Sequence, residues 1–469
     1  MVDSFGRRAS CAGARRTGTG VGRDSFAAAT YRLVPGSAID VSFDAKIEKL
    51  FHKAGAVGSS GGANTWESRM KRMGILAVLA ATTCFAASAF AAEPIVLGWV
   101  GPLSAPGNFS GGQEMQWAVQ LEVDQINEAG GLLGRPLKVV YEDTKGQPAE
   151  GSAAAVRLIT RDNASAIFGE FHSSVALAET EVAHKYNVAW VGTDVWADKL
   201  TAQQYPEVFR LAPANSLVYV RVAEWIASQG FKHVAIVAEN TDFGQDGAKV
   251  VSTILKQKNI DQKLVTIDLN QQDFTPALLR LMNEGEKPDI IQMVVAGQAQ
   301  YQIVKQACQL GLAPNANTKL LGSTGLLQKE VWEVDGDCGK GLLVVNIATP
   351  KSQLNDKAKT FVAAFQKKYD RAPTGVAMEA YDTLGVVVAA IQKVNSAERK
   401  DVINGLEEVS WVGVNGRYSF PSAKEPAWAF HQFMDVPFHI IQYSAVNQPP
   451  GDAPIVFPKN WATTDKLLP

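Results

Sequence analysis

Residues 126–143 read INEAGGLLGRPLKVVYED, and they join the end of a helix to a strand. Before this stretch, apolar residues fall at i, i+3, i+4, i+8 and i+11 from Met115 to Ile126. This spacing predicts one face of a helix, interrupted only by Glu122. The β-branched run that follows is typical of a strand buried in a sheet. A helix that leads directly into such a strand predicts a parallel sheet with right-handed crossovers.

The same alternation of strands and helices surrounds this stretch. Strands buried on both faces are predicted at Ile95–Val100, Leu137–Glu142, Ala166–Gly169 and Val188–Gly192. Two further helices are predicted at Ala153–Ile159 and Val175–His184.

The pattern then repeats toward the C-terminus. The predicted strands are Val234–Ala238, Leu264–Leu269, Ile290–Val295, Leu320–Ser323 and Leu342–Ile347, followed later by Gly416–Phe420 and Phe438–Tyr443. The predicted helices are Gly247–Gln257, Tyr301–Leu310, Asp356–Tyr369, Val376–Val394 and Ala397–Glu408. The sequence therefore predicts the α/β class, with two doubly wound, Rossmann-like lobes. Ligands bind such sheets at the C-terminal ends of the strands.

Composition and charge narrow the classes of partner. The chain has 469 residues, 46% of them hydrophobic and 20% charged, which is an ordinary globular composition. The first 91 residues carry 12 Lys and Arg against 6 Asp and Glu, whereas the remainder carries 33 against 41. An acidic body argues against nucleic acid or an anionic membrane as the main partner. No apolar run reaches the roughly 20 residues that span a bilayer.

The N-terminal region has the features of an export signal. Met70-Lys71-Arg72-Met73 is a short basic start, residues 74–85 are apolar, and Ala89-Phe90-Ala91 offers small residues for a signal peptidase. We expect a signal peptide at 70–91, cleavage before Ala92 and a periplasmic location, and a buried helix is the alternative. Residues 1–69 are then expected to be a spurious or disordered extension.

Cleavage there would leave two of the four cysteines, Cys308 and Cys338. Two cysteines 30 positions apart in an exported chain indicate one disulfide, and two unrelated buried thiols are the alternative.

Signatures of catalysis are missing from the sequence. It has no G-x-S-x-G elbow, H-E-x-x-H helix, Walker A loop or strand-linked G-x-G-x-x-G. Its six His never pair at the spacing of metal ligands. We therefore expect no enzyme, no metal and no cofactor.

Polar and aromatic residues instead follow the predicted strands. Phe171, Ser173 and Ser174 leave the third strand and open a helix. Ser173 or Ser174 is an N-cap candidate, and the free N–H groups there suit a carboxylate, although Ser caps without any ligand are common.

The fourth strand and the second lobe offer similar loops. Thr193, Asp194 and Trp196 suit a small amphipathic ligand, and a solvated turn with one buried Trp explains them equally well. Phe243 follows the first strand of the second lobe, where it either closes over a ligand or packs the helix start.

The order V-G-P-L-S-A-P-G at 100–107, followed by the stretch at 126–143, resembles the opening of periplasmic branched-chain amino-acid-binding proteins. These are the solute-binding components of ABC importers for hydrophobic amino acids and amides. The family reads strand, G-P-x-S-G, helix, I-N-x-x-G-G-I-x-G, strand, D-D. Further matches are Phe209-Arg210, Phe243-Gly244, Asp273-Phe274, Pro288-Asp289 and Gly341-Leu342, so that the resemblance covers nearly all of 93–458.

The resemblance implies a type I periplasmic-binding fold, in which three crossing strands join two lobes that close on the ligand. The expected first lobe is 92–213 plus 348–435, and the second is 214–347 plus 436–469. The family's own cysteine pair falls near Lys145 and His172, so a bond between Cys308 and Cys338 would lie in the second lobe instead.

The resemblance also assigns expected binding positions. Ser173 matches the serine that holds the ligand carboxylate, and Phe109 and Phe243 match aromatic walls. Asp194 and Trp196 stand where the family has Ala and Thr, and Gln298 lies near a position that is aromatic in the family.

The largest departure is Thr324, which replaces the glutamate that pairs with the ligand ammonium. A buried ammonium without an anion is costly. Either Asp194 takes over that role or the ligand has no ammonium.

These features predict an extracytoplasmic solute-binding protein of an ABC importer. The expected partners are an amino acid, an amide or an aliphatic or aromatic carboxylate, together with the permease subunits, and we expect a monomer. A periplasmic ligand sensor of the same fold is the alternative, and an exported hydrolase is a further one.

Overall fold

The computed structural model describes residues 92–315 and 317–468. The predicted signal peptide at 70–91 and the predicted extension at 1–69 lie outside the described residues. Within the described part of the chain, no helix combines the length and the apolar character that a membrane span requires.

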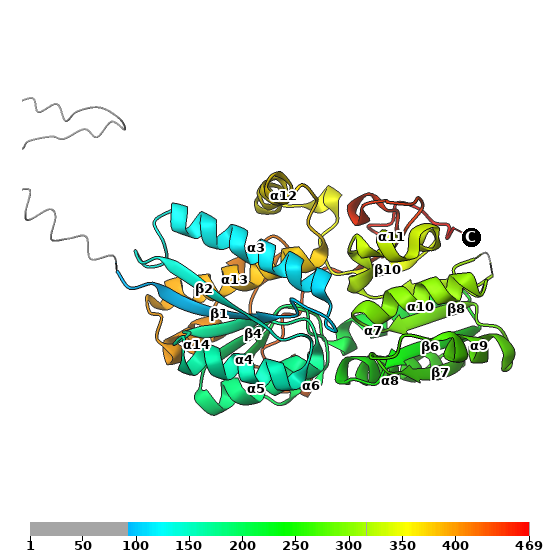
Figure 1. Cartoon of the computed structure of the whole chain (residues 1–469), viewed down its shortest axis with the longest axis horizontal. Coiled ribbons are helices and arrows are strands. Elements are labelled where there is room, and N and C mark those ends of the chain that lie inside the picture. Colours follow the sequence, from blue (N-terminus) through cyan, green and yellow to red (C-terminus); the bar gives the residue numbers. More distant parts are fainter. Residues whose placement is uncertain (1–91, 316, 469) are drawn as a thin grey trace, which may run out of the picture. The chain divides into compact units, whose positions relative to one another are not determined.

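The first lobe is built on a parallel sheet of five strands in the order β2-β1-β3-β4-β5. The strands are β1 (Ile95–Gly101), β2 (Leu137–Asp143), β3 (Ala166–Gly169), β4 (Ala189–Gly192) and β5 (Val208–Arg210). Its helices are α3 (Phe109–Glu128), α4 (Pro148–Thr160), α5 (Ser173–Tyr186), α6 (Lys199–Ala202), α12 (Asp356–Tyr369), α13 (Gly375–Val394) and α14 (Arg399–Glu407). α3 packs with α13 on one face of the sheet, and α4 packs with α5 on the other (Figure 1).

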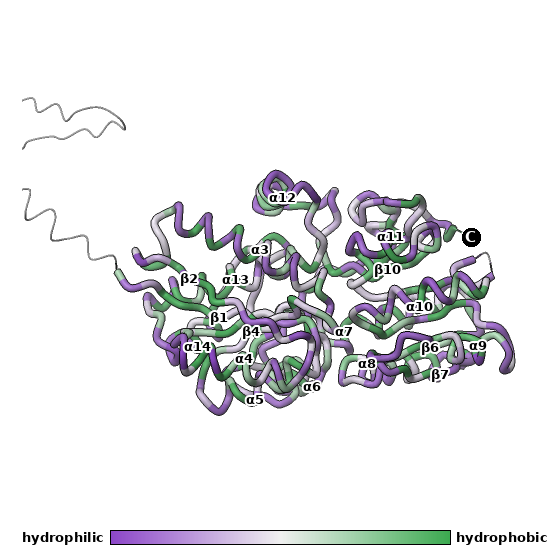
Figure 2. The backbone as a smooth tube through the Cα atoms, viewed as in Figure 1, coloured by the Kyte–Doolittle hydropathy of each residue, from purple (hydrophilic) through white to green (hydrophobic). Residues whose placement is uncertain are grey.

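Hydropathy follows this layering. β1 runs through a mainly hydrophobic segment, whereas α3 alternates between hydrophobic and hydrophilic residues along its length (Figure 2). Met115, Ala118 and Val119 of α3 are fully buried, as the helical spacing predicts.

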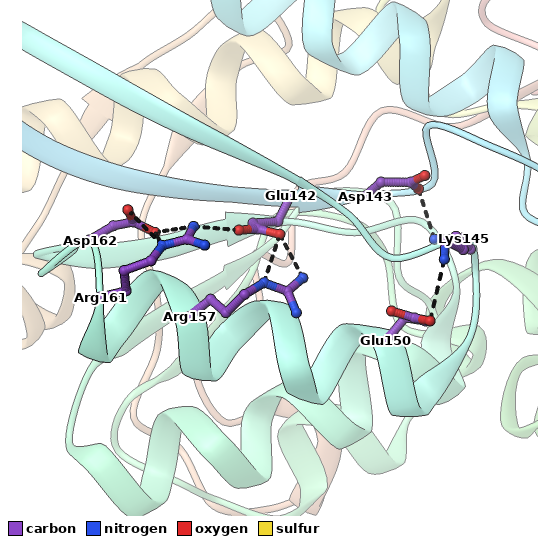
Figure 3. A network of polar contacts seen from close by, with 7 residues as sticks. All are labelled: Glu142, Asp143, Lys145, Glu150, Arg157, Arg161 and Asp162. Atoms are coloured by element: carbon purple, nitrogen blue, oxygen red, sulfur yellow. Dashed lines mark hydrogen bonds and ion pairs between the residues drawn. The ribbon is translucent and has the colours of Figure 1, made fainter.

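The edge strand β2 corrects one prediction, because only Leu137 of this strand is fully buried. β2 pairs with β1 alone, so its outer side meets water instead of another strand. The Glu142 side chain points toward α4, where it accepts hydrogen bonds from Arg157 of this helix and from Arg161 just after it (Figure 3). These hydrogen bonds lower the pKa of Glu142.

Asp143, the last residue of β2, fixes the loop that leaves β1. Its carboxylate accepts the N–H of Leu103 at 2.8 Å and the hydroxyl of Ser104 at 2.5 Å. The carboxylate also accepts the N–H of Lys145 at 2.8 Å (Figure 3). The acidic end of the opening sequence stretch therefore holds the G-P-L-S loop in place at the C-terminal edge of the sheet.

The second lobe is built on a sheet of seven strands in the order β14-β13-β10-β9-β8-β6-β7. The strands are β6 (His233–Glu239), β7 (Asp261–Ile267), β8 (Ile290–Val294), β9 (Lys319–Gly322), β10 (Leu343–Asn346), β13 (His439–Gln442) and β14 (Ile455–Phe457). Its helices are α7 (Asn215–Ser228), α8 (Asp242–Gln257), α9 (Thr275–Asn283), α10 (Gln298–Gln309) and α11 (Glu330–Asp335). The five strands β6 to β10 pair in parallel. β13 runs antiparallel to both β10 and β14, so this sheet is mixed, whereas the sequence predicts a parallel one.

Two predicted strands are placed differently. The strand expected at Leu264–Leu269 is β7 at Asp261–Ile267, because its register with β6 begins at His233 opposite Asp261. β7 is an edge strand that leaves Leu264 52% exposed, so its polar first residues are tolerated. The strand expected at Gly416–Phe420 is only β12 (Arg417–Tyr418), which pairs with β11 (Trp411–Val412).

The chain crosses between the lobes three times. It passes from β5 to α7, returns from β10 to α12, and passes again before β13. The third crossing lies along β5, because Arg210 N donates to His431 O and Phe433 N donates to Arg210 O. The buried Arg210 side chain also donates to Ala197 O at 2.6 Å and to Thr201 Oγ1 at 2.9 Å. The prediction of two Rossmann-like lobes joined by three crossings is confirmed.

Candidate functional site

A pocket lies between the C-terminal ends of the two sheets. Loops after β3 and β4 form one side of it, and the ends of β6, β8 and β9 with the start of α8 form the other. Its lining residues are Phe171, His172, Ser173, Asp194, Trp196, Glu239, Phe243, Ala296, Ser323 and Thr324. Both lobes therefore contribute to one cavity, at the strand ends where the sequence predicts it.

Aromatic side chains form the apolar wall of the pocket. The rings of Trp196 and Phe243 come from opposite lobes and meet edge to face, with centroids 5.9 Å apart. Tyr219 of α7 packs behind both rings, 6.1 Å from Trp196 and 6.2 Å from Phe243. Such a wall suits an apolar or aromatic ligand side chain.

Ser173 lines the pocket, but the prediction that Ser173 or Ser174 is the N-cap of its helix is wrong. The N-cap of α5 is His172, and its side chain makes no capping bond. The Ser173 hydroxyl turns instead to the loop after β4, where it accepts the N–H groups of Trp196 and Ala197 at 3.1 Å each. The hydroxyl proton is then available to donate to an acceptor in the pocket.

Ser174 and Thr193 do not line the pocket. Ser174 Oγ donates to Asp242 Oδ2 at 2.7 Å and accepts the Asp242 N–H at 3.1 Å, which ties α5 to the first turn of α8 across the two lobes. Thr193 is fully buried and donates to Thr383 Oγ1 of α13 at 3.1 Å.

Asp194 is one of two carboxylates in the pocket wall. It accepts hydrogen bonds from Trp196 Nε1 and, at 3.2 Å, from Thr324 Oγ1 of the other lobe. Burial raises its pKa to about 6. Asp194 and Thr324 therefore meet in the site, and the bond between them connects the two lobes.

Glu239 is the second carboxylate, and the sequence did not single it out. It accepts the N–H of Ala296 at 2.6 Å and the hydroxyl of Thr241. Burial raises its pKa to about 7. The predicted strand ends at Ala238, one residue short of β6, so Glu239 falls outside the predicted strand.

His172 also lines the pocket without having been predicted. Burial lowers its pKa to about 4, so the ring is neutral near pH 7. Its Nε2 accepts the N–H of Asn108 at 3.0 Å, which assigns the proton to Nδ1. This bond fixes the loop before α3 against the loop after β3. Ser323 and Ala296 complete the second-lobe wall.

Two further predicted positions, Phe109 and Gln298, lie outside the pocket wall. Phe109 is the first residue of α3 and is 44% exposed. Its neighbour Asn108 is buried and caps α3 by accepting the N–H of Gly111. Gln298 is the first residue of α10 and is exposed.

Cys308 and Cys338 are bonded to each other, with Cα atoms 5.8 Å apart. The bond joins the C-terminal turn of α10 to the short 3₁₀ helix Gly336–Gly339, so it lies in the second lobe. Among residues 92–315 and 317–468, no group of three or more His, Cys, Asp or Glu could hold a metal ion.

The amino-acid sequence matches the family model described as "Periplasmic binding protein" over residues 94–434. The leucine-, isoleucine-, valine-, threonine- and alanine-binding protein of Pseudomonas aeruginosa is 23% identical over 357 residues, 75% of this chain and 92% of the relative. The Leu/Ile/Val-binding protein BraC3 of Rhizobium johnstonii is 26% identical over 331 residues, 70% of this chain and 87% of the relative.

Solved structures show the same architecture. The branched-chain amino acid transporter substrate binding protein LivJ of Streptococcus pneumoniae, in complex with isoleucine, has a TM-score of 0.67 at 22% identity and covers 78% of this chain and 100% of that one. A solute binding protein of an ABC transporter from R. palustris, in complex with benzoate, also has a TM-score of 0.67, at 21% identity, and covers 78% of this chain and 96% of that one. The chain belongs to the periplasmic binding protein family, and its two α/β lobes have the type I fold of that family.

Proposed function

We propose that this chain is the solute-binding component of an ABC importer, and that it closes two lobes around an amino acid or a related small carboxylate. The observation that carries the proposal is the pocket itself, because strand ends of both sheets line one cavity. The bond between Asp194 and Thr324 and the bonds between Ser174 and Asp242 connect the lobes beside it. A ligand held at such a junction stabilises the closed arrangement over the open one.

The polar groups around the pocket support a ligand with both a polar end and an apolar end. The Ser173 hydroxyl is a free donor for a carboxylate, and the aromatic wall of Trp196 and Phe243 suits the apolar part. The relatives are named for binding branched-chain amino acids, and one structural neighbour holds benzoate. These names support the ligand class without selecting a member of it.

We propose a binding role without catalysis. Ser173, the pocket serine of the first lobe, accepts two backbone N–H groups and has no His partner among the described residues. His172 is held by Asn108 and is neutral near pH 7. A nucleophile with an adjacent base is the usual sign of an acyl-transfer site. Purified protein should therefore not turn over ester or amide substrates, and measurable turnover that Ser173→Ala abolishes would refute this.

Export is part of the same proposal. A protein expressed from Met70 should reach the periplasm with Ala92 as its N-terminal residue, and residues 1–69 should be dispensable. N-terminal sequencing of the exported protein checks this. A mature protein that retains residues 1–69 would contradict it.

The ligand class is tested by a thermal-shift screen of amino acids, amides and aromatic carboxylates. A ligand that binds the native state at 100 times its Kd adds about 2.7 kcal/mol to stability and raises the midpoint. The proposal expects at least one member of these classes to do so, with one molecule bound per monomer. A sensor of the same fold would also bind, and it is distinguished by whether the liganded protein stimulates a permease and ATPase reconstituted in vesicles.

A further inference from the structure

We infer that the ligand carries an ammonium group and that Glu239, at the end of β6, pairs with it together with Asp194 after β4. This inference rests on the proposed function and names the ligand class of the same pocket. The negative charge that pairs with the ammonium would then lie at Glu239, and not at the position of Thr324, where the family resemblance expects it.

The charges of the pocket wall carry the inference. Asp194 and Glu239 line it from opposite lobes, while Lys and Arg are absent from its lining residues. Asp194 is 3% exposed and Glu239 is 2% exposed. Buried carboxylates are retained where a cation or several donors compensate them. A ligand with only a carboxylate would bring a third acidic group to a wall that already has two.

Glu239 is held in place for such a role. Its carboxylate accepts one hydrogen bond on each oxygen, from Ala296 N and Thr241 Oγ1, which leaves further lone pairs on both oxygens. α8 begins directly against it, since a Cβ atom on Gly244 would lie 2.5 Å from Glu239 Cγ. The side chain therefore cannot swing toward α8, and the anion is oriented before any ligand arrives.

One hydroxyl behind the aromatic wall of the pocket, that of Tyr219, has no hydrogen-bond partner among the described residues. This hydroxyl is fully buried. It lies within electrostatic reach of both Glu239 and Asp194. A positive charge bound at the two carboxylates would act over the same range, which a purely apolar or anionic ligand would not supply.

The test compares amino acids with the same skeletons lacking the amine. L-leucine is titrated against 4-methylpentanoate, and L-phenylalanine against 3-phenylpropanoate, by calorimetry at pH 7.5. We expect one amino acid to bind and its deaminated partner to bind at least tenfold more weakly. Glu239→Gln should weaken amino-acid binding roughly 10- to 150-fold, the range for one hydrogen bond to a charged group.

Asp335→Asn is the matched control, because Asp335 is a buried carboxylate of the second lobe that does not line the pocket. Its affinities should equal those of the wild type. If Glu239→Gln does not fold, two other measurements decide whether the ligand ammonium is recognised. They are the amino-acid affinity of Asp194→Asn and the comparison of each amino acid with its deaminated partner on the wild-type protein. Equal binding of an amino acid and its deaminated partner, or unchanged affinity in a folded Glu239→Gln, would overturn the inference and leave the proposed function standing. Binding of neither amino acid would also overturn the inference, whereas the proposed function falls only if the wider thermal-shift screen of amino acids, amides and aromatic carboxylates finds no ligand.

Discussion

Ser173→Ala should lower both the stability of the protein and its affinity for ligand. The Ser173 hydroxyl accepts the N–H groups of Trp196 and Ala197, and all three residues are buried. Removing this acceptor leaves two buried donors without a partner. The loop that carries Asp194 and Trp196 would therefore loosen even before a ligand binds.

The size of the effect follows from the two bonds. Each buried donor that is left without a partner costs about 1–3 kcal/mol, so the loss should be about 2–6 kcal/mol. An unfolding entropy of roughly 2.1 cal/mol/K per residue gives roughly 0.8 kcal/mol/K for residues 92–468, so Tm should fall by roughly 3–8 °C. Loss of a charge-assisted bond to a ligand carboxylate should weaken binding by roughly 10- to 150-fold in addition.

Thermal unfolding and calorimetric titration of the best-binding amino acid separate the two effects. Ser152→Ala is the control, because Ser152 donates to Ala178 O on the α4–α5 side of the first lobe, outside the pocket. It should leave affinity unchanged. An unchanged Tm in Ser173→Ala would refute the role in the loop, and unchanged affinity would refute contact with the ligand.

Three further outcomes are expected. Burial raises the pKa of Glu239 to about 7, and a bound ammonium lowers it again, so binding of an amino acid releases a proton. Affinity for the amino acid should then fall roughly tenfold from pH 8 to pH 6. A wild-type affinity that does not change with pH would count against this, and so would the same fall in affinity in Glu239→Gln. Ser174→Ala breaks both hydrogen bonds to Asp242, which connect the two lobes. Affinity should therefore drop by roughly 2- to 12-fold, and small-angle scattering should show a larger ligand-free protein. A radius of gyration identical to that of the wild type would argue against a contact that holds the lobes closed. Replacing Cys308 and Cys338 by Ser opens a loop whose ends are 30 residues apart and should cost about 3–4 kcal/mol, whereas two free thiols in the unfolded, unreduced wild type would show that the bond does not form.

Periodicity alone predicted most of the strands, because a strand buried on both faces has an apolar run that is visible in the sequence. It failed at the edges of the sheets. β7 begins with Asp261, outside the apolar run that was used to predict it, and β2 has such a run although it is a half-exposed edge strand. The antiparallel direction of β13 depends on which strands it pairs with, and β10 lies far away in the sequence, so periodicity could not predict it.

The site was predicted in part. The loops after β3 and β4 follow strand ends directly, so Ser173, Asp194 and Trp196 could be found from the order of the elements. Glu239 depended on the exact last residue of a strand, and one residue decides which face of the sheet a side chain occupies. Phe109 was expected in the pocket, but the capping bond of Asn108 leaves it on the surface.

The central claim is that one ligand lies between the lobes with its charged ends on opposite walls. A crystal structure of the protein with its best-binding amino acid tests this most directly. The ligand should occupy the pocket, with its ammonium roughly 2.7–3.2 Å from a carboxylate oxygen of Glu239 and its carboxylate at Ser173 Oγ. A ligand outside the pocket, or one whose carboxylate faces Glu239, would contradict the account.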